Sequence, residues 1–151
     1  MSVSVQPITD RYDRQDELHE HIGFSEVITK ETLINAASKH CPPTELDSNC
    51  FGLPESQVKP YLLDVFRSAQ EKNERRFLSH FTSSAHHPWN MPEAAGETFD
   101  YLQKPRWRLE HPLNRYLNTV KYDDMWIGQI VDMIDEFCMA DETLVVMVGD
   151  Q

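Results

Sequence analysis

The sequence lacks the features that mark membrane-spanning, secreted and nucleic-acid-binding proteins. Its longest uninterrupted apolar run is residues 144–148, far short of the roughly 20 residues that a transmembrane helix needs. Its first residues have neither the basic start nor the apolar stretch of a secretory signal, so the compartment is left open. Only 14 basic residues stand against 25 acidic ones, for a net charge of −11, and this balance argues against nucleic acid as a partner.

The motifs of several common catalytic and metal sites are absent as well. There is no phosphate-binding glycine loop, no dinucleotide-binding fingerprint, no nucleophile elbow and no zinc-protease motif. His19 and His21 would point apart on a helix, so they do not form a metal-binding pair. Cys41 begins a run that imitates a Cys-x-Pro-x-Arg nucleophile motif, but Glu45 takes the arginine position, so we expect no cysteine nucleophile. The cysteines form no C-x-x-C pair and no disulfide framework: Cys41, Cys50 and Cys138.

The composition that remains is that of one globular domain with an α/β fold. A chain of 151 residues, 40% hydrophobic and 26% charged, can build one core of ordinary size. Strands are predicted around Val3 and Val5, over residues 77–81 and over residues 143–148, the last being of the type buried on both faces. Together with the helices described next, this order predicts a parallel sheet flanked by helices.

Three helices are predicted between these strands. The first covers residues 30–40, the second starts at residue 55, and the third covers residues 113–138. The second helix has apolar side chains at helical spacing: Val58, Leu62, Val65, Phe66 and Ala69. The third has one apolar stripe: Leu113, Leu117, Val120, Ile127, Val131, Ile134 and Cys138.

A carboxylate interrupts the stripe of the third helix. Asp124 falls where an apolar residue is due between Val120 and Ile127. Because burying an unpaired carboxylate is costly, Asp124 is expected to be hydrogen-bonded or to lie beside the functional site. Two interpretations stay open at this point: a polar residue that fixes a neighbouring loop, or a catalytic residue.

Side chains with useful chemistry gather in residues 77–92, FLSHFTSSAHHPWNMP. The hydroxyl residues 82–84 end the strand and two prolines forbid a helix, which places His86 and His87 on a loop past the strand's carboxyl end. Open α/β sheets bind ligands at that edge. With Trp89, the two imidazoles can form a wall that binds an anion or stands beside a metal. The other interpretation is a surface loop whose histidines have no role.

A second candidate position follows the last predicted strand. Gly149 and Asp150 stand at its carboxyl end. A carboxylate there is well placed to bind a divalent cation through a hard oxygen ligand.

Several short motifs occur in an order that is typical of one family: Tyr12-Asp13-Arg14, Ile22-Gly23-Phe24, Phe51-Gly52-Leu53, FLSHFTSSAHHPW, KYDDMWIGQIVDMI and DETLVVMVGD. Together they resemble the middle of the sulfatase domain in the alkaline phosphatase superfamily, and most of all its lipoteichoic-acid-synthase-like branch. The resemblance extends from about residue 10 to residue 150. In that branch a His-x-Pro-aromatic loop follows a strand, and a Tyr-x-Asp helix leads to a strand that ends in Gly-Asp-His-Gly.

The resemblance implies an alkaline-phosphatase-like sheet and a metal-dependent hydrolase of sulfuric or phosphoric esters. It implies that His86 is a catalytic residue that contacts the sulfate or phosphate group, and that His87 and Trp89 flank it as substrate-binding residues. Asp150 corresponds to a ligand of the divalent cation, which is calcium, magnesium or manganese. Tyr122 and Asp124 correspond to structural positions of the helix near the site.

The chain departs from the family pattern at its end. Gln151 stands where the family has a histidine, and the region that carries the nucleophile and the other metal carboxylates has no counterpart. We therefore expect residues 1–151 to be the middle portion of a sulfatase-like domain, inactive as an isolated chain. The alternative is a non-catalytic module that binds an anion through the His86-His87 loop, or a partner through its incomplete sheet edge.

Overall fold

Three parallel strands form the centre of the molecule. The computed structural model describes residues 1–11, 14–35, 40, 52–103 and 110–149. Within them, β1 (Ser2–Val5), β2 (Glu26–Ile28) and β3 (Phe77–His80) pair in the order β2-β1-β3. β1 is the middle strand, with Val3 opposite Glu26 of β2 and Leu78 of β3. The predicted α/β class with a parallel sheet is therefore confirmed.

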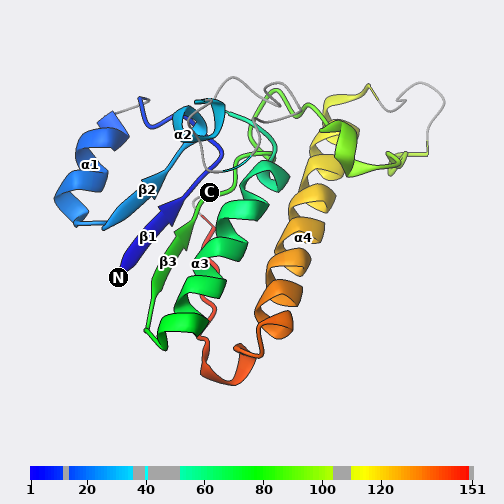
Figure 1. Ribbon diagram of the computed structural model, residues 1–151. Coiled ribbons are helices and arrows are strands. Elements are labelled where there is room, and N and C mark those ends of the chain that lie inside the picture. Colours follow the sequence, from blue (N-terminus) through cyan, green and yellow to red (C-terminus); the bar gives the residue numbers. More distant parts are fainter. Residues whose placement is uncertain (12–13, 36–39, 41–51, 104–109, 150–151) are drawn as a thin grey trace.

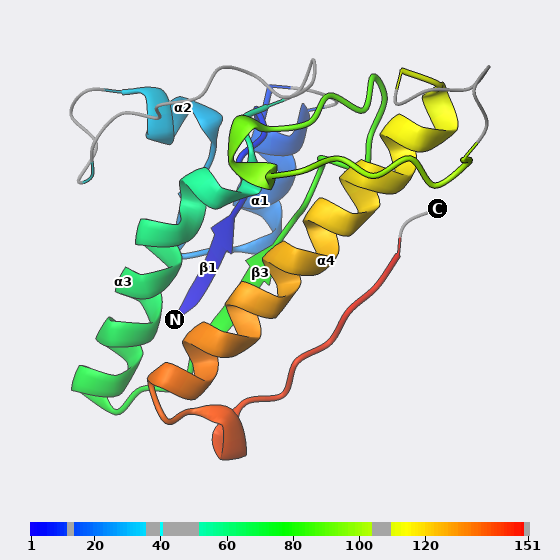
Figure 2. The same cartoon turned by 90° about the vertical axis from the view of Figure 1, so that its right-hand side faces the viewer.

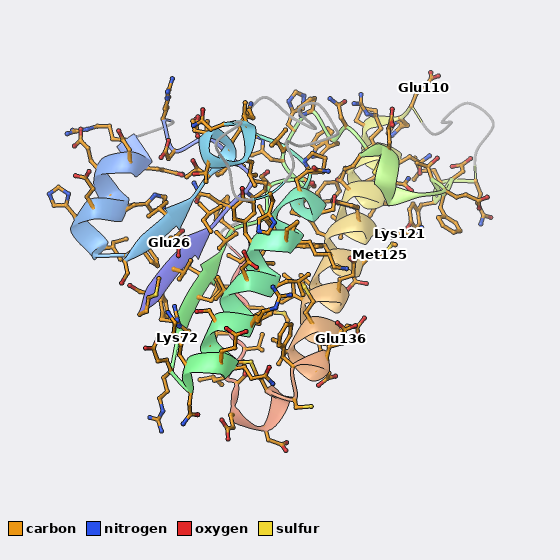
Figure 3. All side chains as sticks on the ribbon, viewed as in Figure 1. Glu26, Lys72, Glu110, Lys121, Met125 and Glu136 are labelled. Atoms are coloured by element: carbon orange, nitrogen blue, oxygen red, sulfur yellow. The ribbon has the colours of Figure 1, made fainter. Side chains whose placement is uncertain are left out.

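Helices cover both faces of this sheet. They are α1 (Gln15–Ile22), α2 (Lys30–Ile34), α3 (Lys59–Lys72) and α4 (Pro112–Glu136), with short 3-10 turns η2 (Glu55–Val58), η3 (Glu93–Ala95) and η4 (Ala140–Glu142). α3 and α4 lie on one face and α1 lies on the other, as Figures 1 and 2 show from two sides. Figure 3 shows Lys72 and Glu136, at the last turns of α3 and α4, at the end of the molecule opposite to Glu110. Both long helices thus begin near the carboxyl ends of the strands.

Two of the three predicted helices are confirmed over most of their length. η2 and α3 together match the helix predicted from residue 55, and α4 matches the one predicted over residues 113–138. The helix predicted over residues 30–40 is α2, which ends at Ile34, and residues 36–39 lie outside the described residues. α1 and β2 were not predicted. α1 has no buried residue and β2 has only three residues, so neither has a strong apolar pattern.

The hydrophobic core lies between β1 and the two long helices. The apolar positions predicted for α3 are buried in it, among them the fully buried Leu62. α4 contributes large side chains: Tyr122, Trp126, Met133 and Ile134. Val3 and Val5 of β1 have no exposed surface, as expected for a central strand covered by helices.

The buried side of α4 differs from the predicted stripe. Ile134 is buried as predicted, but several stripe residues are exposed: Leu113, Val120, Val131 and Cys138. Three residues of the first half that are buried are polar: Asn114, Asn118 and Thr119. The side-chain oxygen of Asn114 accepts from the Leu102 N–H, and that of Asn118 accepts from the Phe99 N–H. Because this face packs on a loop through hydrogen bonds, apolar periodicity does not detect it.

The prediction of a buried strand over residues 143–148 is wrong for this structure. Residues 143–149 form neither helix nor strand, and Leu144 and Val148 are 88% and 87% exposed. Figure 2 shows the segment as an extended trace beside α4. A strand that is covered on both faces needs neighbours to pair with, and none of the three described strands pairs with it. The apolar pattern shows that residues 143–148 favour a buried strand. None of the three described strands provides the neighbour that such a strand would pair with.

Gly52 joins the exit of β1 to the segment that leads into η2. It forms an antiparallel bridge with Ile8, and the Leu53 N–H donates to the Pro7 carbonyl at 3.1 Å. A Cβ atom on Gly52 would lie 2.4 Å from the Pro7 carbonyl oxygen and 2.7 Å from the Ile8 Cα. This contact explains why glycine occupies the position in the Phe51-Gly52-Leu53 motif.

The close approach at Gly52 predicts a large loss of stability on substitution. We expect Gly52→Ala to lower the free energy of unfolding by about 1–3 kcal/mol, because backbone atoms have to move apart. Gly128 of α4 is the matched control, since a Cβ there meets nothing within 4 Å. Gly128→Ala should raise stability by about 0.5–1 kcal/mol through helix propensity. Urea unfolding of both variants measures the two effects, and equal shifts would refute the close contact.

Candidate functional site

The loop that follows β3 lies at the switch point of the sheet. From the central β1, the chain moves to β2 on one side and later to β3 on the other. In open α/β sheets the crevice at the carboxyl ends of such strands is the usual ligand site. Residues 81–92 leave β3 at that edge and run near the first turns of α3 and α4 (Figure 1). The predicted position of the His86-His87 loop is therefore confirmed.

Both histidines of this loop have exposed side chains. The His86 N–H donates to the Ser83 carbonyl at 2.9 Å, which closes a tight turn. The His86 Nδ1 lies 2.8 Å from the His87 carbonyl oxygen. Because a carbonyl only accepts, Nδ1 carries the hydrogen, and Nε2 becomes a donor only when the ring is protonated.

Trp89 is fixed at the far end of the loop by contacts from both sides. Its indole N–H donates to the Ala85 carbonyl at 3.0 Å, and its ring packs edge-on against His87 and Tyr116. Arg115 of α4 donates through Nε to the Trp89 carbonyl at 3.3 Å. Trp89 adopts a positive φ of 60°, a conformation that costs a non-glycine residue energy. The contacts hold Trp89 in this conformation. Trp89 also lines a hollow of about 380 Å³ together with four neighbouring residues: Asn90, Met91, Glu110 and Arg115.

A buried carboxylate lies beneath the start of the loop. Glu55 of η2 has no exposed surface. Its Oε1 accepts from the backbone N–H groups of Ser83 and Ser84 at 2.7 and 2.8 Å, and its Oε2 accepts from the Ser84 hydroxyl. Hydrogen bonds to an ionised acceptor are among the stronger ones in proteins. Glu55 therefore fixes the two residues at which the strand turns into the loop.

A second carboxylate, Asp123 of α4, contacts the next residue of the loop. Its Oδ2 accepts from the Ala85 N–H at 3.2 Å, while its Oδ1 is buried without a hydrogen-bond partner among the described residues. Burial, together with the nearby Glu55 carboxylate, raises the pKa of Asp123 to about 7. Asp123 thus gains or loses its proton near neutral pH while bound to the loop.

The two predicted residues of α4 have different surroundings. Tyr122 is buried, and its hydroxyl accepts from the Ser56 N–H at 3.2 Å, next to Glu55. The side chain of Asp124 is exposed, so the expectation that it lies on the buried stripe is wrong. Its neighbour Asp123 is the carboxylate that faces the loop. The helix is rotated relative to the predicted stripe, which places position 123 inward and position 124 outward.

His80, the last residue of β3, is a half-buried structural histidine. Its Nδ1 donates to the Val5 carbonyl at 2.8 Å, and its Nε2 accepts from the Trp126 indole N–H at 2.8 Å. Burial lowers the pKa of His80, so the ring is held neutral. It therefore ties β3 to β1 and α4 directly before the loop begins.

Several predicted residues fall outside the described part of the chain. They are Tyr12, Asp13, Cys41, Cys50, Phe51, Asp150 and Gln151. Among the described residues, no three His, Cys, Asp or Glu side chains form a group that could hold a metal ion. The described residues by themselves therefore do not fit a divalent cation. No helix in the described ranges has both the length and the apolar character to cross a membrane.

Sequence reasoning missed Glu55 and Asp123 as parts of the site. Glu55 begins a predicted helix, where an acidic residue is common for local reasons. Asp123 stands next to the carboxylate that interrupted the stripe, and the pattern pointed to the wrong one of the pair. The available signal was the adjacent pair of aspartates in a helix whose other side is apolar, which shows that one of them has to face inward or be paired.

Comparison with known proteins places this loop and sheet in one family. The family model described as sulfatase matches residues 5–151. The chain belongs to the sulfatase family. No curated protein sequence gives a significant match.

Solved structures share the fold of this sulfatase chain. The lipoteichoic acid synthase LtaP from Listeria monocytogenes superposes with a TM-score of 0.73 and 14% identity, over 93% of this chain and 31% of that one. A protein in the alkaline phosphatase superfamily from Vibrio parahaemolyticus gives a TM-score of 0.63 and 21% identity, over 89% of this chain and 28% of that one. The chain thus spans less than a third of the length of these structures. The predicted sulfatase family is confirmed by the family model.

The raised pKa of Asp123 predicts a pH-dependent stability. Between the ordinary aspartate value of 3.8 and about 7, the folded state binds more protons at Asp123 than the unfolded state does. Folding stability from this group is therefore greatest at low pH and falls as the pH rises through this window. Asp123→Asn keeps an acceptor oxygen for the Ala85 N–H and removes the titration. Melting temperatures measured across the window should fall more steeply for the natural chain than for the variant, and parallel curves would contradict the assignment.

Proposed function

We propose that this chain is part of a sulfatase-like hydrolase of sulfuric or phosphoric esters, and that it supplies the wall that contacts the transferred group. One observation carries the proposal. The His86-His87-Pro88-Trp89 loop lies at the carboxyl end of a parallel strand, in a chain that the sulfatase family model matches almost throughout.

The chemistry of the loop suits an anionic group. His86 uses Nδ1 to hold the His87 carbonyl, so it offers an N–H at Nε2 only as the charged imidazolium. A charged donor fixed by its own backbone contact can stabilise negative charge on the oxygens of a transferred group. His87 and Trp89 flank it as substrate-binding residues.

The names of the two structural relatives support the proposed substrate class, which is esters of these oxyacids. LtaP is named a synthase of lipoteichoic acid, and the second structure is named for the alkaline phosphatase superfamily. By analogy we assign residues 1–151 as the middle portion of such a domain, with the nucleophile and most metal ligands supplied by parts outside this chain. The isolated chain is accordingly expected to show no turnover of aryl sulfates or aryl phosphates.

A non-catalytic binding module is the second candidate function. Among the described strands, β3 pairs on one side only, and the apolar residues 144–148 are exposed. An unpaired strand edge and an exposed apolar segment both favour pairing with another polypeptide. In this alternative the His86-His87 loop binds an anion but catalyses no reaction.

Anion binding by the isolated chain tests the role of the loop. We expect inorganic sulfate and phosphate to bind the natural chain. His86→Ala should weaken this binding about tenfold, equivalent to roughly 1.4 kcal/mol. His21→Ala is the matched control, because His21 is an exposed histidine of α1 that also contacts a backbone carbonyl through Nδ1. Titration followed by NMR or calorimetry measures the affinities. Equal affinities in all three proteins would exclude His86 as the contact.

Asp150 is the proposed ligand for a divalent cation. We expect calcium, magnesium or manganese to raise the melting temperature of the natural chain slightly, because one carboxylate contributes only part of a site. Asp150→Ala should abolish the increase. Equal shifts in the two proteins would dismiss Asp150 as a ligand.

A further inference from the structure

Three consecutive backbone N–H groups of the loop are directed at carboxylates of the protein itself. Those of Ser83 and Ser84 donate to Glu55, and that of Ala85 donates to Asp123. Successive backbone N–H groups in a turn can form a concave site that binds an external anion. Here the carboxylates of Glu55 and Asp123 already accept hydrogen bonds from these N–H groups.

The charge of Glu55 is balanced by these donors rather than by a cation. Among the described residues no Lys or Arg forms an ion pair with Glu55, although it is completely buried. Burying a carboxylate in this way is expensive unless hydrogen bonds replace its water. An uncharged side chain of the same size would avoid this desolvation cost. We therefore infer that the role of the carboxylate is to fix the geometry of Ser83 and Ser84.

The carbonyl groups of the same loop residues transmit this geometry to the proposed site. Ser83, fixed through its N–H by Glu55, accepts the His86 N–H on its carbonyl. Ala85, fixed through its N–H by Asp123, accepts the Trp89 indole N–H on its carbonyl. Each carboxylate is therefore two hydrogen bonds away from a residue of the proposed substrate wall.

We propose that Glu55 and Asp123 are the positioning residues of the His86-His87 loop, Glu55 setting the place of His86 and Asp123 setting the place of Trp89. With the N–H groups of residues 83–85 occupied, a bound sulfate or phosphate meets the imidazoles rather than the backbone. The role as an anion wall rests on the proposed function, whereas the positioning of the loop does not.

The test separates positioning from general stability. Glu55→Gln keeps the size of the side chain but replaces a charged acceptor with a neutral amide. Asp123→Asn does the same for the second contact when the spectra are recorded above pH 7, where Asp123 is ionised. Leu62→Ala is the matched destabilised control, because Leu62 is a fully buried residue of α3 in the apolar core. All variants are compared by urea unfolding, by amide and indole NMR spectra, and by titration with inorganic sulfate.

The expected pattern assigns each carboxylate to its own part of the loop. Glu55→Gln should move the Ser83 and Ser84 amide signals and the His86 signals, and should weaken sulfate binding about tenfold. Asp123→Asn should move the Ala85 amide and the Trp89 indole signals. Leu62→Ala should lower stability while these signals keep their positions. If Glu55→Gln does not fold, Ser84→Ala, which removes only the hydroxyl contact to Oε2, should still displace the Ser83 and His86 amide signals.

Two results would overturn the inference. One is a folded Glu55→Gln or Ser84→Ala variant whose loop signals match those of the natural chain. The other is a Leu62→Ala variant that displaces the loop signals to the same extent. Failure of the natural chain to bind sulfate would instead refute the proposed function, because the amide and indole signals report the position of the loop without any anion.

Discussion

The buried contact between Glu55 and the N–H groups of Ser83 and Ser84 is the constraint on which the site depends. It joins two parts that are distant in sequence: the turn before α3, and the junction between β3 and the histidine loop. Gly52 contributes to the same arrangement, because its close approach to Pro7 brings η2 to the exit of β1. Tyr122 completes it by accepting from the Ser56 N–H. The exposed histidine loop is therefore held from below by the buried carboxylate of Glu55.

This arrangement divides the polar groups of the molecule into two sets. His80, Glu55 and Asp123 are enclosed and use their hydrogen bonds to set backbone positions. His86 and His87 have exposed side chains. Such a division suits a site for a charged, hydrated group, since buried partners define the shape and exposed imidazoles meet the ligand. The match to the sulfatase family model agrees with this interpretation of the loop as a site for a charged group.

Local sequence patterns predicted the elements and failed where partners decide the outcome. β3, α3, α4 and the histidine loop follow from prolines, hydroxyl residues and apolar spacing within each segment. The buried face of α4 did not, because Asn114 and Asn118 face inward to bind the backbone of a distant loop. The same rotation exchanged Asp123 for Asp124. Residues 143–148 have the composition of a buried strand, but a strand also requires a neighbour, which no local pattern supplies.

The central place of β1 has a consequence for how the chain folds. β1 comprises residues 2–5, yet it is hydrogen-bonded on both sides, and Val5 meets His80 across 75 positions of sequence. The middle strand thus comes first in the chain, and its second partner follows only after α3. Closing so long a segment costs chain entropy before the core repays it. The edge of the sheet from which the histidine loop leaves therefore depends on a pairing between residues far apart in sequence, and pairings of this kind slow folding in general.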